Sequence, residues 1–143
     1  MTKNLDSDGL RSIVENYDIF YIDLWGVVHN GITLHKNAIE ALEEITTAKK
    51  DYILLTNAPR PNKVVKTILE KMGMNKEIRE KVYSSGEASL SYLKKNYSDK
   101  LYYHIGPARD FDLFSDFKKI NLKILKIVSI YYVQDYLKNR PKT

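Results

Sequence analysis

The sequence predicts an α/β fold built on a mostly parallel sheet. Between residues 18 and 105, short apolar runs alternate with segments whose apolar residues recur at helical spacing. Such alternation is typical of βαβ units, whose crossovers are right-handed. The chain of 143 residues has the length of one ordinary domain and is long enough to bury a core.

The first elements lie within residues 10–49. Residues 10–16 predict a short helix, and residues 18–24 predict a strand that ends just before a turn at Gly26. A longer helix is expected over residues 37–49, because its apolar residues share one helical face.

A second strand and its helix follow. Residues 51–56 are short and apolar enough to predict a strand that is buried on both faces. Residues 57–61 predict a loop, with Pro61 near the first position of the next helix. That helix is expected to stop at Gly73, a residue type common just beyond a helix end.

The remaining elements become less regular. Residues 81–86 predict a third strand that ends in small residues, and residues 87–95 predict a helix. A fourth strand is expected at residues 101–105 and a short helix at residues 111–117. Beyond them, the segment 120–137 is rich in apolar residues and lysine but fits neither the helical nor the strand period.

Composition excludes several classes of protein. Hydrophobic residues make up 43% and charged residues 29% of the chain, as in globular proteins. Because the chain has no cysteine, it can form neither a disulfide framework nor a cysteine-based zinc site. No apolar run reaches transmembrane length, and the N-terminal residues lack the apolar core of a signal peptide. These features predict a cytoplasmic protein with no membrane partner.

The net charge of +5 is concentrated in one segment. Residues 1–116 carry 16 basic and 17 acidic side chains, whereas residues 117–143 carry seven basic side chains and one acidic. Binding of nucleic acid would therefore depend on this tail alone. Its lysines are scattered among apolar residues without a recognisable binding motif, so a solvated basic end is the favoured interpretation.

The candidate chemistry lies where the first two strands end. Asp23 follows an apolar run, and Thr56-Asn57 follow the next one. Because carboxyl ends of parallel strands meet at one edge of a sheet, these residues are expected to share a crevice. A carboxylate can attack phosphorus, while a hydroxyl and backbone amides can bind phosphate oxygens. The alternative for Asp23 is a helix cap or turn carboxylate; its strand-end position favours phosphoryl transfer.

Several segments together resemble a known family. They are residues 23–31 (Asp-Leu-Trp-Gly-Val-Val-His-Asn-Gly), 37–42, 54–60 (Leu-Leu-Thr-Asn-Ala-Pro-Arg), 84–88 and 104–106. In this order and spacing they resemble the start of a haloacid dehalogenase-superfamily hydrolase, closest to the class IIA sugar- and nucleotide-phosphatase-like proteins. The resemblance covers residues 10–117. It implies a Rossmann-like core at residues 1–86, of which this is the N-terminal half, and the beginning of an α/β cap domain at residues 87–117.

The resemblance also implies site residues and a cofactor. Asp23 matches the nucleophile, which also binds Mg²⁺ through its carboxylate, and the backbone carbonyl of Trp25 matches a second metal ligand. Thr56 matches the phosphate-binding hydroxyl, and Asn57 lies beside it. Trp25 occupies the position where most phosphatases of the superfamily have an aspartate that acts as general acid and base. The lysine and the acidic metal-binding pair that the family places after its cap do not occur in the sequence.

Three functions remain open at this stage. The first is a Mg²⁺-dependent phosphatase of small phosphorylated metabolites. The second, which we favour for present activity, is an inactive, incomplete form of such an enzyme, or a half-enzyme completed by a complementary chain. The third is a noncatalytic module that binds through the basic tail, residues 118–143. We expect this atypical tail to reflect truncation or a disrupted reading frame.

Overall fold

The computed structural model describes residues 8–105, 114–117 and 130–133 of the chain. The chain divides into two compact units, Met1–Glu87 and Ala88–Thr143. Whether the two correspond to a core and a cap domain stays a prediction.

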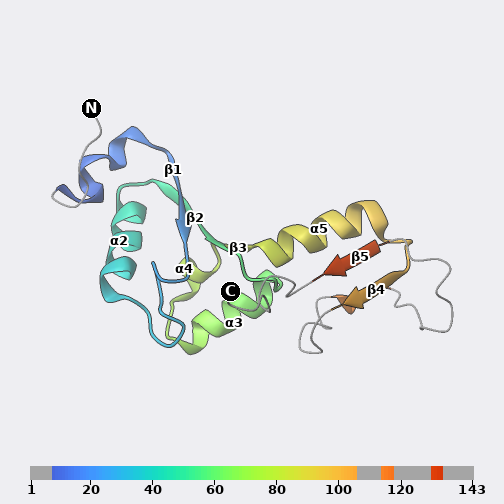
Figure 1. The fold of residues 1–143 in the computed structure, drawn as a ribbon. Helices are drawn as coiled ribbons and strands as arrows, with labels where there is room; N and C mark the ends of the chain where they lie inside the picture. The colour runs from blue at the N-terminus through green and yellow to red at the C-terminus, as the bar shows by residue number, and fades with distance from the viewer. Residues whose placement is uncertain (1–7, 106–113, 118–129, 134–143) are drawn as a thin grey trace, which may run out of the picture. The chain divides into compact units, whose positions relative to one another are not determined.

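The first unit contains a parallel three-stranded sheet. Its strands β1 (Ile19–Asp23), β2 (Asp51–Thr56) and β3 (Val82–Ser84) lie in the order β1-β2-β3 (Figure 1). Asp23 pairs with Leu55, and Thr56 pairs with Ser84. The predicted α/β architecture with a parallel sheet is therefore confirmed.

Helices connect these strands close to where the sequence predicts them. Helix α2 (Lys36–Thr47) joins β1 to β2, and α3 (Asn62–Lys71) follows β2. Gly73, with φ +89°, lies just beyond α3, as expected for a helix stop. A short helix, α4 (Lys76–Arg79), was not predicted; the side chain of Asn75 caps it by accepting a hydrogen bond from the Ile78 amide.

Before the sheet, the predicted helix over residues 10–16 is replaced by two 3₁₀ turns, η1 (Leu10–Ser12) and η2 (Val14–Asn16). Only three residues contribute to each turn, too few for an α-helix to propagate.

The core of the first unit lies on one face of its sheet. Tyr52 and Leu54 of β2 are buried there with residues of both connecting helices, Leu42, Ile45, Val65 and Leu69. Right-handed crossovers between strands in the order β1-β2-β3 put α2 and α3 on the same side.

The other face of the sheet is exposed among the described residues. The exposed fraction is 65% for Tyr21, 37% for Leu55 and 43% for Tyr83. The prediction that β2 is buried on both faces is therefore wrong, because α2 and α3 both pack on the opposite side.

The outer edge of β1 is also open. The carbonyl of Asp18 and the amide of Leu24 both bond to residues of β2. Since successive residues of a strand direct their backbone groups to opposite sides, the amides and carbonyls of Ile19, Tyr21 and Asp23 point away from β2. No described strand pairs with this edge of β1.

The second unit contains most of helix α5 (Ser85–Tyr97) and a parallel pair, β4 (Tyr102–Ile105) and β5 (Ile130–Val133). Leu90, Tyr102 and Phe114 form a small buried cluster. Strand β5 falls within residues 120–137, for which neither the helical nor the strand period predicts an element. Residues 111–113 of the predicted last helix lie outside the described residues, and 114–117 form a turn. No helix in the described parts of the chain is long and apolar enough to cross a membrane.

Candidate functional site

The strand ends of the first unit bring the predicted site residues to one edge of the sheet. Asp23 is the last residue of β1, Thr56 the last of β2 and Ser84 the last of β3. All three strands are parallel and in register there, so their carboxyl ends form a continuous rim. This is the edge at which open α/β sheets bind their ligands.

Asp23 presents an available carboxylate at this rim. Its side chain is exposed, and one oxygen, Oδ1, accepts a hydrogen bond of 2.9 Å from the amide of Leu24. That amide also bonds to the carbonyl of Leu55, at 3.0 Å, which fixes the turn out of β1. Oδ2 accepts no hydrogen bond from the described residues, so one oxygen is open for a ligand.

Thr56 begins the loop that follows β2. Its hydroxyl oxygen accepts a hydrogen bond of 3.2 Å from the amide of Ala58, which curls the loop back over the strand end. Asn57 lies between them and is exposed. The Thr56 hydroxyl proton remains available for donation, and an exposed amide side chain stands beside it.

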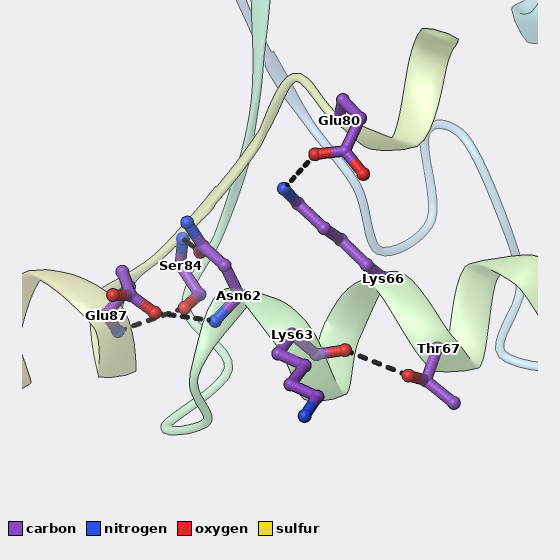
Figure 2. Close-up of polar contacts among 7 residues, drawn as sticks. All are labelled: Asn62, Lys63, Lys66, Thr67, Glu80, Ser84 and Glu87. Carbon is purple, nitrogen blue, oxygen red and sulfur yellow. Dashed lines mark hydrogen bonds and ion pairs between the residues drawn. The ribbon is translucent and has the colours of Figure 1, made fainter. Parts of the chain in front are cut away.

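The end of this loop is hydrogen-bonded to Ser84 of β3, which is only 1% exposed. The Ser84 hydroxyl donates to the carbonyl of Arg60 at 2.5 Å and accepts from the amide of Glu87 at 3.1 Å. The Ser84 amide in turn donates to the Asn62 side chain at 2.9 Å (Figure 2). One buried hydroxyl thus joins the loop, the start of α3 and the start of α5.

Two further hydrogen bonds connect the same segments. The carboxylate of Glu87 accepts a hydrogen bond of 2.9 Å from the amide of Asn62, one of the unpaired donors of the first turn of α3 (Figure 2). The amide of Gly86 donates to the Ala58 carbonyl at 3.1 Å. A Cβ atom on Gly86 would lie 2.2 Å from the backbone nitrogen of Arg60, so only glycine permits this approach.

The turn after β1 holds Trp25 against Gly31. A Cβ atom on Gly31 would lie 2.5 Å from Cη2 of the indole, so the ring rests directly on the glycine backbone. The ring of His29 meets the indole edge-on, with centroids 5.5 Å apart. The amide of Gly26 donates to the His29 carbonyl at 2.8 Å and closes the turn.

His29 is a structural residue of this turn. It is 8% exposed, and its Nδ1 accepts a hydrogen bond of 3.0 Å from the amide of Gly31. The neutral ring therefore carries its proton on Nε2. Burial, followed by the charge of His35, lowers the pKa of His29, while Asp23 acts in the opposite direction.

A complete metal site is not formed by the described residues. None of them form a group of three or more His, Asp or Glu side chains able to hold an ion. Two oxygen donors suited to Mg²⁺ are present, the carboxylate of Asp23 and the backbone carbonyl of Trp25, which accepts no hydrogen bond from the described residues. The chain thus fits part of a magnesium site.

The sequence located the strand-end residues but missed what supports them. Asp23, Thr56 and Asn57 lie at one rim, as expected, while their chemical roles stay predictions. The tie through Ser84, Asn62 and Glu87 was not foreseen. The run of small residues at the end of β3 was a signal, because a buried hydroxyl and a glycine allow two backbone segments to approach closely.

Comparison with known proteins gives a consistent result. Residues 20–120 match a family model described as haloacid dehalogenase-like hydrolase. Phosphoglycolate phosphatase 2 of Arabidopsis thaliana is 28% identical over 105 residues, which span 71% of this chain and 35% of that protein.

Solved structures agree on the fold. A haloacid dehalogenase-like hydrolase from Brucella suis superposes with a TM-score of 0.67 at 27% identity, covering 82% of this chain and 43% of its own. NagD from Escherichia coli gives 0.62 at 18% identity, covering 86% and 48%. A glycerol phosphate phosphatase from Mycobacterium tuberculosis, solved in complex with magnesium, gives 0.56 at 20% identity, covering 76% and 33%. The chain therefore spans less than half the length of these relatives.

Proposed function

Because the chain belongs to the haloacid dehalogenase-like hydrolase family, we propose that it carries the nucleophile and the phosphate-binding part of a phosphohydrolase site. Small phosphorylated metabolites are the proposed substrates, and relatives named as phosphatases support this class. The observation that carries the proposal is the common rim formed by the ends of β1 and β2, where Asp23 has an open oxygen and Thr56 an available hydroxyl.

In the proposed reaction a carboxylate oxygen of Asp23 attacks phosphorus. The bond from phosphorus to the ester oxygen breaks, and the leaving oxygen takes a proton from water. A second water then attacks the aspartyl phosphate, which releases inorganic phosphate and returns the free carboxylate. The hydroxyl of Thr56 and the amide groups of its loop hold the phosphate oxygens during both steps.

Magnesium is the proposed cofactor. Asp23 and the carbonyl of Trp25 would hold it, together with water and the substrate phosphate, and the ion would neutralise phosphate charge. The indole of Trp25 cannot exchange a proton as a carboxylate does, so the leaving group lacks a general acid at that position. That loss corresponds to about 10²–10⁴-fold in rate.

We further propose that the 143 residues alone turn over little or no substrate and need a complementary polypeptide. The open edge of β1 and the exposed face of the sheet support this, because parallel sheets are normally covered on both faces. The nucleophile Asp23 ends the strand whose outer edge is open. A polypeptide added beside β1 would therefore reach the site.

The test compares hydrolysis of p-nitrophenyl phosphate with Mg²⁺ by the chain alone and after mixing with the part of the Brucella suis hydrolase that this chain does not match. We expect no turnover alone and turnover in the mixture, abolished by Asp23→Asn. Recombining the two parts of the Brucella suis protein serves as the positive control.

Two other outcomes are informative. Turnover by the chain alone that Asp23→Asn removes would show that no partner is needed. No turnover in the mixture, when the control recombines actively, would contradict the proposed function.

A further inference from the structure

An exposed indole stands next to the proposed nucleophile. Trp25 follows Asp23 by two residues, and its side chain is 63% exposed. Two more apolar side chains of the same segment are exposed, Val27 at 50% and Ile32 at 81%. Isolated exposed apolar residues are ordinary, but here three lie within eight residues of the segment that follows β1.

The indole is held in place although it is exposed. It rests on the backbone of Gly31, whose φ of +93° is a conformation that glycine adopts without strain. The ring of His29 lies nearly perpendicular to the indole, at an interplanar angle of 83°. A ligand that stacks on the free face of Trp25 would therefore immobilise little that is not already fixed.

The segment after Trp25, residues 28–35, is also held by hydrogen bonds. The side-chain oxygen of Asn30 accepts hydrogen bonds from the amides of Ile32 and Thr33, at 2.9 and 2.8 Å. The amide of His35 donates to the carbonyl of Val28 at 2.8 Å, and Val28 is fully buried. Backbone and side-chain hydrogen bonds thus anchor the segment that follows Trp25.

We propose that Trp25 is a specificity residue whose exposed indole stacks on a planar ring in the leaving group of the phosphate ester. The inference rests on the proposed function, because phosphorus bound at Asp23 puts the ester's leaving group at the rim where Trp25 lies. An indole offers a flat, polarisable face and one N–H donor, which suits recognition of a ring rather than proton transfer. Aryl and nucleoside phosphates are the substrates of this class.

The expected preference follows from the strength of aromatic stacking. Stacked pairs contribute enough beyond surface burial to tighten binding by about 2- to 12-fold. Phenyl phosphate should therefore bind about 2- to 12-fold more tightly than glycerol 3-phosphate, which has the same phosphate group and no ring.

The experiment uses a property of this sequence, which contains a single tryptophan. Its fluorescence reports on Trp25 alone when tryptophan is excited selectively. Phenyl phosphate, glycerol 3-phosphate and inorganic phosphate are titrated into the full chain with Mg²⁺. Fluorescence follows the indole, and NMR shifts of the Thr56 and Asn57 amides follow phosphate binding independently.

Side-chain variants then isolate the ring, because they leave the Trp25 carbonyl in place. Trp25→Leu should lose the preference for phenyl phosphate and keep the affinity for inorganic phosphate, whereas Trp25→Phe should keep part of the preference. Ile32→Ser is the matched control, since it removes an exposed apolar side chain of the same segment. It should leave the preference unchanged.

The outcomes separate the two proposals. Equal affinities for the ringed and ringless esters, or the same preference in Trp25→Leu, would overturn the stacking inference while phosphate binding at Thr56 still stands. Failure of inorganic phosphate itself to shift the Thr56 and Asn57 amides would overturn both the stacking inference and the proposed function of the chain.

Discussion

Replacing Gly86 by alanine is the sharpest test of the tie between the loop after β2 and the start of α5. The added Cβ atom would lie 2.2 Å from the nitrogen of Arg60 and 2.5 Å from its carbonyl oxygen. Ordinary contacts of a Cβ atom begin near 3.4 Å. The obstacle is backbone rather than a flexible side chain, so the loop and α5 must separate by roughly 1 Å.

The cost of this separation can be worked out from the contacts it disturbs. Overpacking of this kind costs about 1–3 kcal/mol. Lengthening the bond from the Gly86 amide to Ala58, and that from the Ser84 hydroxyl to Arg60, costs about 1 kcal/mol each. Alanine favours the helix by up to about 1 kcal/mol and offsets part of this. The expected net loss is about 2–5 kcal/mol.

The assay is urea unfolding followed by circular dichroism, with amide exchange measured at residue 86 and at Glu87, whose amides donate to Ala58 and Ser84. We expect a lower unfolding midpoint and faster exchange at both of these amides. Thr67→Ala is the control: Thr67 is an exposed position of α3, and alanine there should raise the free energy of unfolding by a few tenths of a kcal/mol. If Gly86→Ala also stabilises the protein, as helix propensity alone predicts, the close approach does not exist.

Three further results are expected. Leu54→Ala should lower the free energy of unfolding by about 2–5 kcal/mol in urea titrations, because Leu54 is fully buried; a loss below 1 kcal/mol would contradict the described core. Ser84→Ala should cost about 1–3 kcal/mol and speed amide exchange at Glu87, whereas unchanged exchange would contradict the buried tie. The hydrogen bond from Lys81 holds the pKa of Asp51 below its usual value. The ion pair therefore stabilises the fold at pH values above the usual carboxyl pKa, and this stabilisation is lost as the pH falls through the pKa of Asp51 in the folded protein. NMR titration should show a higher pKa of Asp51 in Lys81→Met.

The sequence predicted the elements that depend on local pattern. β2 runs over the residues expected of it, and Gly73 ends α3 as anticipated, because apolar periodicity and glycine at a helix end are local signals. Apolar periodicity could not predict that the first helix splits into η1 and η2, or that α4 forms. A single turn is stabilised by its neighbours rather than by its own period.

The candidate site divides in the same way. Strand ends are readable from sequence, so Asp23 and Thr56 could be placed together once a parallel sheet was expected. The hydrogen bonds of Ser84 with Arg60 and Asn62 join residues more than twenty positions apart, and so does the approach of Gly86 to Arg60. Such contacts depend on how three elements pack. Their only signal in the sequence is the run of small residues at the end of β3.

The wrong expectation for β2 is itself informative. Ile53 and Leu55 are apolar, as a strand buried on both faces requires, yet they lie on the exposed side together with Tyr21. Alternation along β1 places Asp23 on this same side, two residues beyond Tyr21. The apolar face, the open backbone edge and the proposed nucleophile therefore coincide. A polypeptide that covers this face would bury apolar surface and enclose Asp23 in one event. Stability and phosphoryl transfer should therefore increase together when the complementary part is added. Amide exchange at Tyr21 should slow in proportion to the activity gained.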